Sequence, residues 1–236
     1  MNALLKLKKE MYSSIINKIK KIAKNGNKSN QSNAKQHHVD DYKFEKDKYA
    51  FVHIPKSGGT SASKVFEKHV NKKIVNLGCH RPVSKKCPPS EYSYVVILRE
   101  PIERVYSYYK MATRNEKNPY NKYAKYGLKC LLKNCWEVRN MSVKYISGRL
   151  KKANKKSYKK AKNNIENFYF LGLFERIEKD IKKAVKKMKK CNIQIEVPHC
   201  RKSNQSSPSR GEIKIIKKYN NLDVKLFEFA KESIKN

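Results

Sequence analysis

The segment that most constrains the fold is YAFVHIPKSGGTSASKVFEKHV, residues 49–70, because it predicts a strand, a tight polar loop and a helix in immediate succession. Val52 and Ile54 end the strand, and the helix carries an apolar stripe at helical spacing. In the intervening PKSGGTS, two glycines let the backbone curl, a lysine supplies charge, and hydroxyls can donate to phosphate oxygens. Amides at the helix N-terminus would complete an anion site. The segment therefore predicts a nucleotide-phosphate loop.

The chain beyond this segment alternates short apolar runs with amphipathic stretches, which is typical of βαβ units. We therefore predict an α/β fold of the three-layer, P-loop-like type, with a central parallel sheet flanked by helices. Strands are expected at 49–54, 73–77, 92–98, 168–173 and 193–197. Helices are expected at 60–71, 101–115, 136–148, 156–166, 175–190, 209–219 and 221–234.

The beginning of the chain differs from the rest in composition. Residues 1–24 place apolar side chains at spacings of three and four among lysines, which predicts a basic amphipathic helix, most regular over residues 3–24. Contact with an anionic membrane surface and packing on the domain both remain open for this helix. Residues 25–41 have almost no large apolar side chain and predict a disordered linker. The catalytic domain is predicted to span residues 42–236.

The charge of the chain bears on its partners. It has 56 Lys and Arg against 20 Asp and Glu, a formal net charge of +36. Such a field attracts nucleic acid, acidic glycans or anionic membranes. A lysine- and asparagine-rich coding bias explains the same composition without selection for binding, so the charge leaves both readings open.

The six cysteines form three couples that are close in sequence, at 79 and 87, 130 and 135, and 191 and 200. This pattern permits disulfides without requiring them. No couple has the CxxC spacing of a zinc or redox motif, so we predict no metal site. The sequence also shows neither an apolar run long enough to span a membrane nor a secretory signal.

A second anion site is predicted in YSYVVILREPIERVYSYYK, residues 92–110, where a strand ends at Arg99 and Pro101 opens a helix. Arginine can make forked hydrogen bonds to phosphate, and Ser107 lies on the same helix. Two structural alternatives stand beside this one. Arg99 could pair with Glu100 or Glu103, and Ser107 could bond to its own helix.

Two other classes of protein are alternatives to a transferase that uses a nucleotide donor. A P-loop kinase acting on a small molecule or nucleic acid needs a Walker A loop, but here the lysine precedes the glycine pair and no magnesium-holding aspartate ends a strand. A non-enzymatic polyanion-binding protein is supported by charge alone, and no nucleic-acid motif accompanies that charge.

FVHIPKSGGTS resembles the 5′-phosphosulfate loop of Golgi-type carbohydrate sulfotransferases, particularly the heparan sulfate 6-O-sulfotransferase branch. RNMSVKYISG, FYFLGLFERIEKDI and NLDVKLFEFAKESI are similar to later segments of that family, so the resemblance covers most of residues 49–234. It departs in lacking the usual membrane anchor and in PHCRKSNQSSPSR, which is only loosely similar to the family's loop over the nucleotide, where Arg201 and Ser203 could reach the donor. By resemblance the compartment is the secretory lumen or Golgi membrane, while the missing anchor leaves a cytoplasmic location open.

The resemblance implies sulfuryl transfer from 3′-phosphoadenosine 5′-phosphosulfate (PAPS) to a hydroxyl of a carbohydrate acceptor, possibly an acidic glycan, without a metal. It implies that Arg99 and Ser107 hold the 3′-phosphate, and that Lys56 steadies the leaving charge. His80, beyond the next strand, matches the family's general base, with Glu67 as a second candidate. The residues that the resemblance assigns to the 5′-phosphate and sulfate are Lys56, Ser57, Gly58, Gly59, Thr60 and Ser61.

Overall fold

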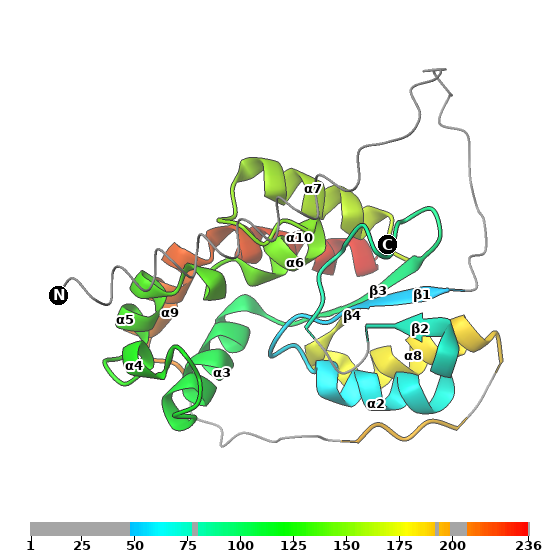
Figure 1. Ribbon diagram of the computed structural model, residues 1–236, viewed down its shortest axis with the longest axis horizontal. Helices are drawn as coiled ribbons and strands as arrows, with labels where there is room; N and C mark the ends of the chain where they lie inside the picture. Colours follow the sequence, from blue (N-terminus) through cyan, green and yellow to red (C-terminus); the bar gives the residue numbers. More distant parts are fainter. Residues whose placement is uncertain (1–47, 77–79, 192–193, 199–206, 236) are drawn as a thin grey trace, which may run out of the picture. The chain divides into compact units, whose positions relative to one another are not determined.

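Four parallel strands form the centre of the computed structural model, which describes residues 48–76, 80–191, 194–198 and 207–235 (Figure 1). All neighbouring strands are parallel, in the spatial order β2-β1-β3-β4. The predicted α/β fold with three layers and a central parallel sheet is therefore confirmed. The strands are β1 (Tyr49–Val52), β2 (Ile74–Val75), β3 (Ser93–Leu98) and β4 (Phe170–Leu173). The predicted helix at 1–24 and linker at 25–41 lie outside the described residues.

One layer of helices covers the sheet through alternate strand residues. Phe51 and Ile97 are both 1% exposed and pack against α2 (Gly59–His69) and α8 (Ile177–Lys189). Because side chains alternate along a strand, the intervening residues face the opposite side of the sheet. Figure 1 shows α2 and α8 together below the sheet.

The second layer lies on the other face. Val52 and Val96, both buried, pack in a cluster with α6 (Met141–Ser147), α7 (Lys155–Glu166) and α10 (Asn221–Lys235). A strand that is buried on both faces must be apolar at every position, and β3 meets this condition from Tyr94 to Leu98. This explains why β3 is a continuous apolar run in the sequence.

A group of helices extends from the end of β3 and has a core of its own (Figure 1). Its largest member is α3 (Pro101–Arg114), which directly follows β3 and starts at the predicted proline. Leu131 and Leu132 are fully buried in this core. The other members are α4 (Asn121–Ala124), α5 (Leu128–Asn134), the 3₁₀ turn η2 (Trp136–Val138) and α9 (Arg210–Tyr219). Two more 3₁₀ turns, η1 (Asn71–Lys73) and η3 (Phe174–Arg176), precede β2 and α8.

The structure corrects two predictions of secondary structure and adds two helices. The helix predicted at 136–148 is broken, because Asn140 has a φ of 45° and separates η2 from α6. The strand predicted at 193–197 is wrong over residues 194–197, which pair with no strand, although Ile195 is buried against α2 and α8. The short helices α4 and α5 were not predicted.

A buried polar network joins three helices across the domain. Arg104 of α3 and Asp223 of α10 have fully buried side chains and form an ion pair of 3.4 Å. The Asp223 carboxylate also accepts hydrogen bonds from the backbone amides of Ser142 and Val143, 3.0 and 2.9 Å long. It therefore caps the N-terminus of α6, whose own preceding residue supplies no side-chain cap.

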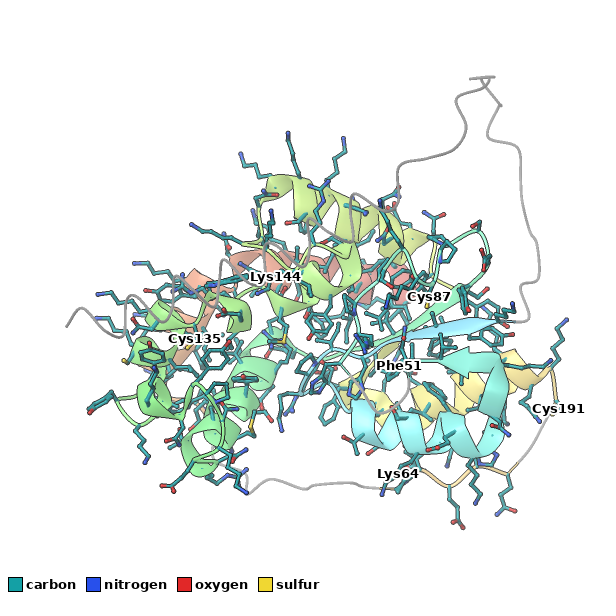
Figure 2. The ribbon with its side chains drawn as sticks, viewed as in Figure 1. Phe51, Lys64, Cys87, Cys135, Lys144 and Cys191 are labelled. Atoms are coloured by element: carbon teal, nitrogen blue, oxygen red, sulfur yellow. The ribbon has the colours of Figure 1, made fainter. Side chains whose placement is uncertain are left out.

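The cysteines that the structure describes are not cross-linked. Cys87, Cys130, Cys135 and Cys191 are free, so the Cys130–Cys135 couple forms no disulfide. Figure 2 shows Cys87, Cys135 and Cys191 in separate parts of the domain. Burial raises the pKa of the Cys135 thiol to about 11, which keeps it protonated. Within the described ranges, the helices are too short or too polar to cross a bilayer.

Candidate functional site

The loop after β1 forms a tight curl that opens onto the N-terminus of α2. Two of its residues lie in the left-handed region, Lys56 with a φ of 67° and Gly58 with a φ of 76°. Gly58 is the N-cap of α2 and supplies no side-chain hydrogen bond, and the first turn of α2 contains no acidic residue. The N-cap residue therefore gives the first amides of this helix no side-chain cap, and their partial positive charge favours an anion.

Ser57 supplies independent evidence for a ligand at this loop. Its side chain is nearly fully buried, at 2% exposure, and within the described part of the chain its hydroxyl has no hydrogen-bond partner. An unpaired buried hydroxyl costs about 1–3 kcal/mol, so natural proteins rarely keep one without a function. A phosphate or sulfate oxygen in the curl of the loop would pair with it.

Both glycines of the loop are required by close packing. A Cβ atom at Gly59 would lie 2.0 Å from ring atoms of His53. A Cβ atom at Gly58 would lie 2.2 Å from the Cδ1 atom of Ile177, at the start of α8. The curl can therefore form only because these positions lack side chains.

Arg99 connects the second predicted anion site to the loop. Its guanidinium donates a hydrogen bond of 3.3 Å to the carbonyl oxygen of Lys56, 43 residues away. The guanidinium also lies 4.3 Å from the centre of the Phe174 ring and 3.5 Å from the Glu103 carboxylate. Burial lowers the pKa of Arg99, and Glu103 opposes this shift. The structure thus brings Arg99 to the backbone of Lys56. Arg99 also forms the ion pair with Glu103 that was considered as the structural alternative.

Acidic residues occupy the start of α3. The amide of Glu100 donates to the carboxylate of Glu175 over 2.7 Å, and the Glu100 carboxylate caps the amide of Glu103. Burial raises the pKa of Glu100. Since these carboxylates already cap α3, its N-terminus is a poor anion site, unlike that of α2.

Ser107 lies two turns into α3 and is 8% exposed. None of the hydrogen bonds described for the domain joins it to Arg99 or to the loop. The structure therefore places Ser107 on the helix that follows Arg99, and the described hydrogen bonds do not link the two residues.

His80 lies beside the loop, as predicted from its place after β2. Its ring meets the ring of His53 edge to face, with 4.8 Å between centroids and an interplanar angle of 77°. The amide of His53 donates to the carbonyl of Arg81 over 3.2 Å, which fixes this segment against the end of β1. Burial, and secondly the charge of Lys56, lower the pKa of His80. A neutral imidazole that can accept a proton at neutral pH follows from this arrangement.

The remaining predicted residues differ in position. Ser61 is buried and Thr60 half-buried in the first turn of α2. Glu67 is exposed two turns further along α2, so the structure does not bring this second candidate base to the loop. Arg201 and Ser203 lie outside the described residues.

Sequence reasoning missed three residues that shape the site. His53 lies within the strand predicted at 49–54, yet in the structure it follows β1 and contacts both Gly59 and His80. Phe174 and Ile177 cover Gly58, and Phe174 also packs on Arg99. The one available signal was that Phe174 directly follows a strand that ends at the same edge as β1 and β3, and that Ile177 opens the helix after it.

Comparison of this sequence with models of protein families finds no match, and comparison with curated proteins finds none either. The functional assignment therefore depends on the chemistry of the site itself.

Proposed function

We propose that this chain is a sulfotransferase that moves a sulfuryl group from PAPS to a carbohydrate hydroxyl. The observation that supports it most is the hydrogen bond from Arg99 to the Lys56 carbonyl, beside an uncapped helix N-terminus. The Arg99 guanidinium thus lies against the backbone of the loop that contains Lys56. A nucleotide with phosphate groups at both its 3′ and 5′ positions needs two adjoining cationic subsites.

The loop residues also fit the sulfonate end of such a donor. The buried hydroxyl of Ser57 can donate a hydrogen bond to a phosphate or sulfate oxygen, and the glycines allow the backbone amides to approach a phosphate closely. In this proposal, Lys56, Ser57, Thr60 and Ser61 and the amides of Gly58 and Gly59 hold the 5′-phosphosulfate. Arg99 holds the 3′-phosphate, with Ser107 as its partner after a rotation of its side chain or a small shift of α3.

His80 would act as general base. The acceptor oxygen forms a bond to sulfur while the bond from sulfur to the bridging oxygen breaks, and phosphoadenosine phosphate leaves. The proton of the acceptor hydroxyl passes to the imidazole, which later releases it to water. Lys56 stabilises the negative charge that develops on the bridging oxygen. The positive charge of its ammonium group is also what lowers the pKa of His80.

The test is a calorimetric titration with phosphoadenosine phosphate, and separately with ATP and Mg²⁺. We expect the bisphosphate to bind more tightly than ATP and Mg²⁺, and Lys56→Ala to weaken it about tenfold or more, the loss expected for a charged hydrogen bond. The matched control is Lys64→Ala, an exposed lysine of α2 that points away from the domain (Figure 2). A preference for ATP and Mg²⁺ would instead favour the P-loop kinase, and equal effects of the two substitutions would favour a non-specific polyanion-binding protein.

A further inference from the structure

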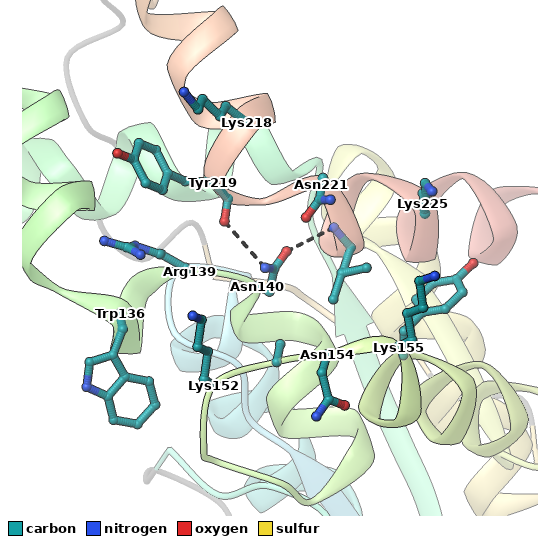
Figure 3. A pocket seen from close by; sticks show the side chains of 13 residues that line it. Trp136, Arg139, Asn140, Lys152, Asn154, Lys155, Lys218, Tyr219, Asn221 and Lys225 are labelled. Carbon is teal, nitrogen blue, oxygen red and sulfur yellow. Dashed lines mark hydrogen bonds between the residues drawn. The ribbon is translucent and has the colours of Figure 1, made fainter.

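A pocket of about 770 Å³ lies between η2, the loop before α7, and the junction of α9 and α10 (Figure 3). None of the predicted donor-site residues lines it. Its volume lies within the range of ligand pockets, about 300–1,000 Å³. The described part of the chain thus contains a second concave site, and the proposed sulfuryl transfer does not use it.

The charged side chains of this pocket are all positive. They are Arg139, Lys152, Lys155, Lys218 and Lys225. The four lysines are exposed, come from three segments of the chain, and form no ion pair with any residue that the structure describes. A concave surface lined by one sign of charge concentrates the field, so the pocket favours a ligand with several anionic groups.

Aromatic surface accompanies this charge. The rings of Trp136, Tyr158 and Tyr219 line the pocket, together with the aliphatic side chains of Ala153 and Leu222. Tyr158 is half-buried and packs partly on the core, and no cation in the described part of the chain lies over its ring. A tyrosine ring beside exposed lysines is a platform on which a planar base can stack.

The other two rings each carry a cation on one face. The ammonium of Lys144 lies 4.9 Å from the centre of the Trp136 ring and donates to the carbonyls of two η2 residues. Because Lys144 is 2% exposed and Trp136 is 41% exposed, the cation lies on the buried side of this ring and leaves indole surface open. The guanidinium of Arg139 lies 4.6 Å from the centre of the Tyr219 ring. Bases stack on arginine planes as well as on aromatic rings, so both pairs can accept a base.

The pocket is preformed, because Asn140 ties its walls together. The side-chain oxygen of Asn140 accepts hydrogen bonds of 3.0 and 3.1 Å from the amides of Leu222 and Asp223 at the start of α10. Its amide group donates to the carbonyl of Tyr219 at the end of α9. Figure 3 shows this side chain between those two helices. A ligand therefore meets a lining whose backbone is already in place, which lowers the cost of binding.

Rings and cations lie on both sides of the pocket. In Figure 3, Trp136 and Tyr219 lie on one side, and Lys155 and Lys225 lie on the other. Tyr158 follows Lys155 by three residues on α7, so these two side chains are neighbours on the helix surface. A single nucleotide offers one base to one side, whereas a strand of several nucleotides offers bases to both sides and phosphates to the lysines.

We infer that this pocket binds a short stretch of single-stranded nucleic acid, whose bases stack on Tyr158 and Trp136 and whose phosphates contact the lysines. Binding of this kind needs only the lining of the pocket, so it is independent of the proposed sulfuryl transfer. Stacking and phosphate contacts read little sequence, because every base has a π face and every nucleotide has a phosphate. Such a site therefore needs no recognisable nucleic-acid motif in the sequence.

The experiment measures binding of a deoxythymidine octamer to the full chain by calorimetry and by tryptophan fluorescence, at physiological salt. Trp136 is the only tryptophan of the chain, so quenching of its fluorescence by a stacked base reports on this pocket. The matched ligand is an abasic octamer, which has the same phosphates but no bases. The test variant is Tyr158→Leu, which keeps an apolar side chain. The matched control is Tyr126→Leu, because Tyr126 is 84% exposed and does not line the pocket.

We expect the thymidine octamer to bind the wild type about tenfold or more tightly than the abasic octamer does, and to quench Trp136. Tyr158→Leu should weaken binding of the thymidine octamer about tenfold, the loss expected for one stacked base, and should change binding of the abasic octamer less than about threefold. Tyr126→Leu should change binding of either ligand less than about threefold.

An abasic octamer that binds the wild type as tightly as the thymidine octamer would overturn the inference, because the pocket would then recognise charge alone, as for any polyanion. So would binding without quenching of Trp136, or equal losses in the two variants. Thymidine 5′-phosphate that binds as tightly as the octamer would also contradict it, since the site would then take one nucleotide and no strand. Phosphoadenosine phosphate titrated into Tyr158→Leu tests the proposed function separately, because the proposed donor site does not include this residue.

Discussion

Replacing Asp223 should destabilise the domain more than any other single change to its buried polar network. Asp223→Ala removes the anion that faces the fully buried guanidinium of Arg104, and it also leaves two amides of α6 without their cap. Breaking one side of a buried ion pair costs about 3–5 kcal/mol, because the other charge stays buried and unpaired. Since domains are stable by about 5–15 kcal/mol, this loss is a large fraction of the free energy of unfolding.

The complementary change should cost less. Arg104→Met keeps an apolar side chain of similar length, and Asp223 retains its hydrogen bonds to the amides of Ser142 and Val143. We therefore expect Arg104→Met to lower the free energy of unfolding by about 1–3 kcal/mol, and the double variant to cost less than the sum of the two. Urea unfolding followed by circular dichroism measures all three. A loss of less than about 1 kcal/mol for Asp223→Ala would refute the reasoning, because no buried charge would then need this partner.

Three further predictions follow from the site and its support. Gly59→Ala forces a Cβ atom to within 2.0 Å of the buried His53 ring. We expect this variant to destabilise the domain by about 1–3 kcal/mol or more in urea unfolding, and to weaken binding of phosphoadenosine phosphate in calorimetry. The control is Gly211→Ala, whose added Cβ atom meets nothing within 4 Å. Because the pKa of His80 is lowered, the rate of sulfuryl transfer should stay constant down to about pH 6.5, the ordinary histidine pKa, and fall only below it; a pH–rate profile that falls already at neutral pH would contradict a neutral His80 base. Burial lowers the pKa of Lys144 to about 8. Between that value and the ordinary lysine pKa, the unfolded chain binds more protons than the folded one, so the free energy of unfolding rises with pH across this window. Lys144→Met should remove this rise in urea unfolding measured at pH 8 and pH 10, and an unchanged pH dependence would show that Lys144 does not cause it.

The sequence pattern predicted the sheet well because its two central strands are buried on both faces and so are apolar, β1 throughout and β3 from Tyr94 to Leu98. It failed at residues 194–197, whose alternating pattern reflects burial of Ile195 against helices and no pairing with a strand. A period of two shows which residues are buried, but it does not show what they pair with. The helices α4 and α5 escaped prediction because they are short and are separated by Gly127, so that neither has room for a clear period.

The candidate site divides in the same way. The loop and Arg99 could be predicted because a strand, a polar loop and a helix are adjacent in sequence. The contacts of His53 with Gly59 and of Phe174 with Arg99 could not, because the first depends on how the loop curls and the second on residues 75 positions apart meeting at one edge of the sheet. Such contacts depend on how whole helices and strands pack together, and the pattern of neighbouring residues in the sequence does not show this.

The central claim, that Arg99 and Lys56 serve different phosphates of one nucleotide, is tested most directly by comparing ligands with and without the 3′-phosphate. Phosphoadenosine phosphate and adenosine 5′-phosphate are titrated into the wild type, Lys56→Ala and Arg99→Ala. We predict that Arg99→Ala weakens the bisphosphate about 10- to 100-fold but leaves adenosine 5′-phosphate unchanged, while Lys56→Ala weakens both. Equal loss of both ligands in Arg99→Ala, or no preference of the wild type for the 3′-phosphate, would contradict the proposed donor site.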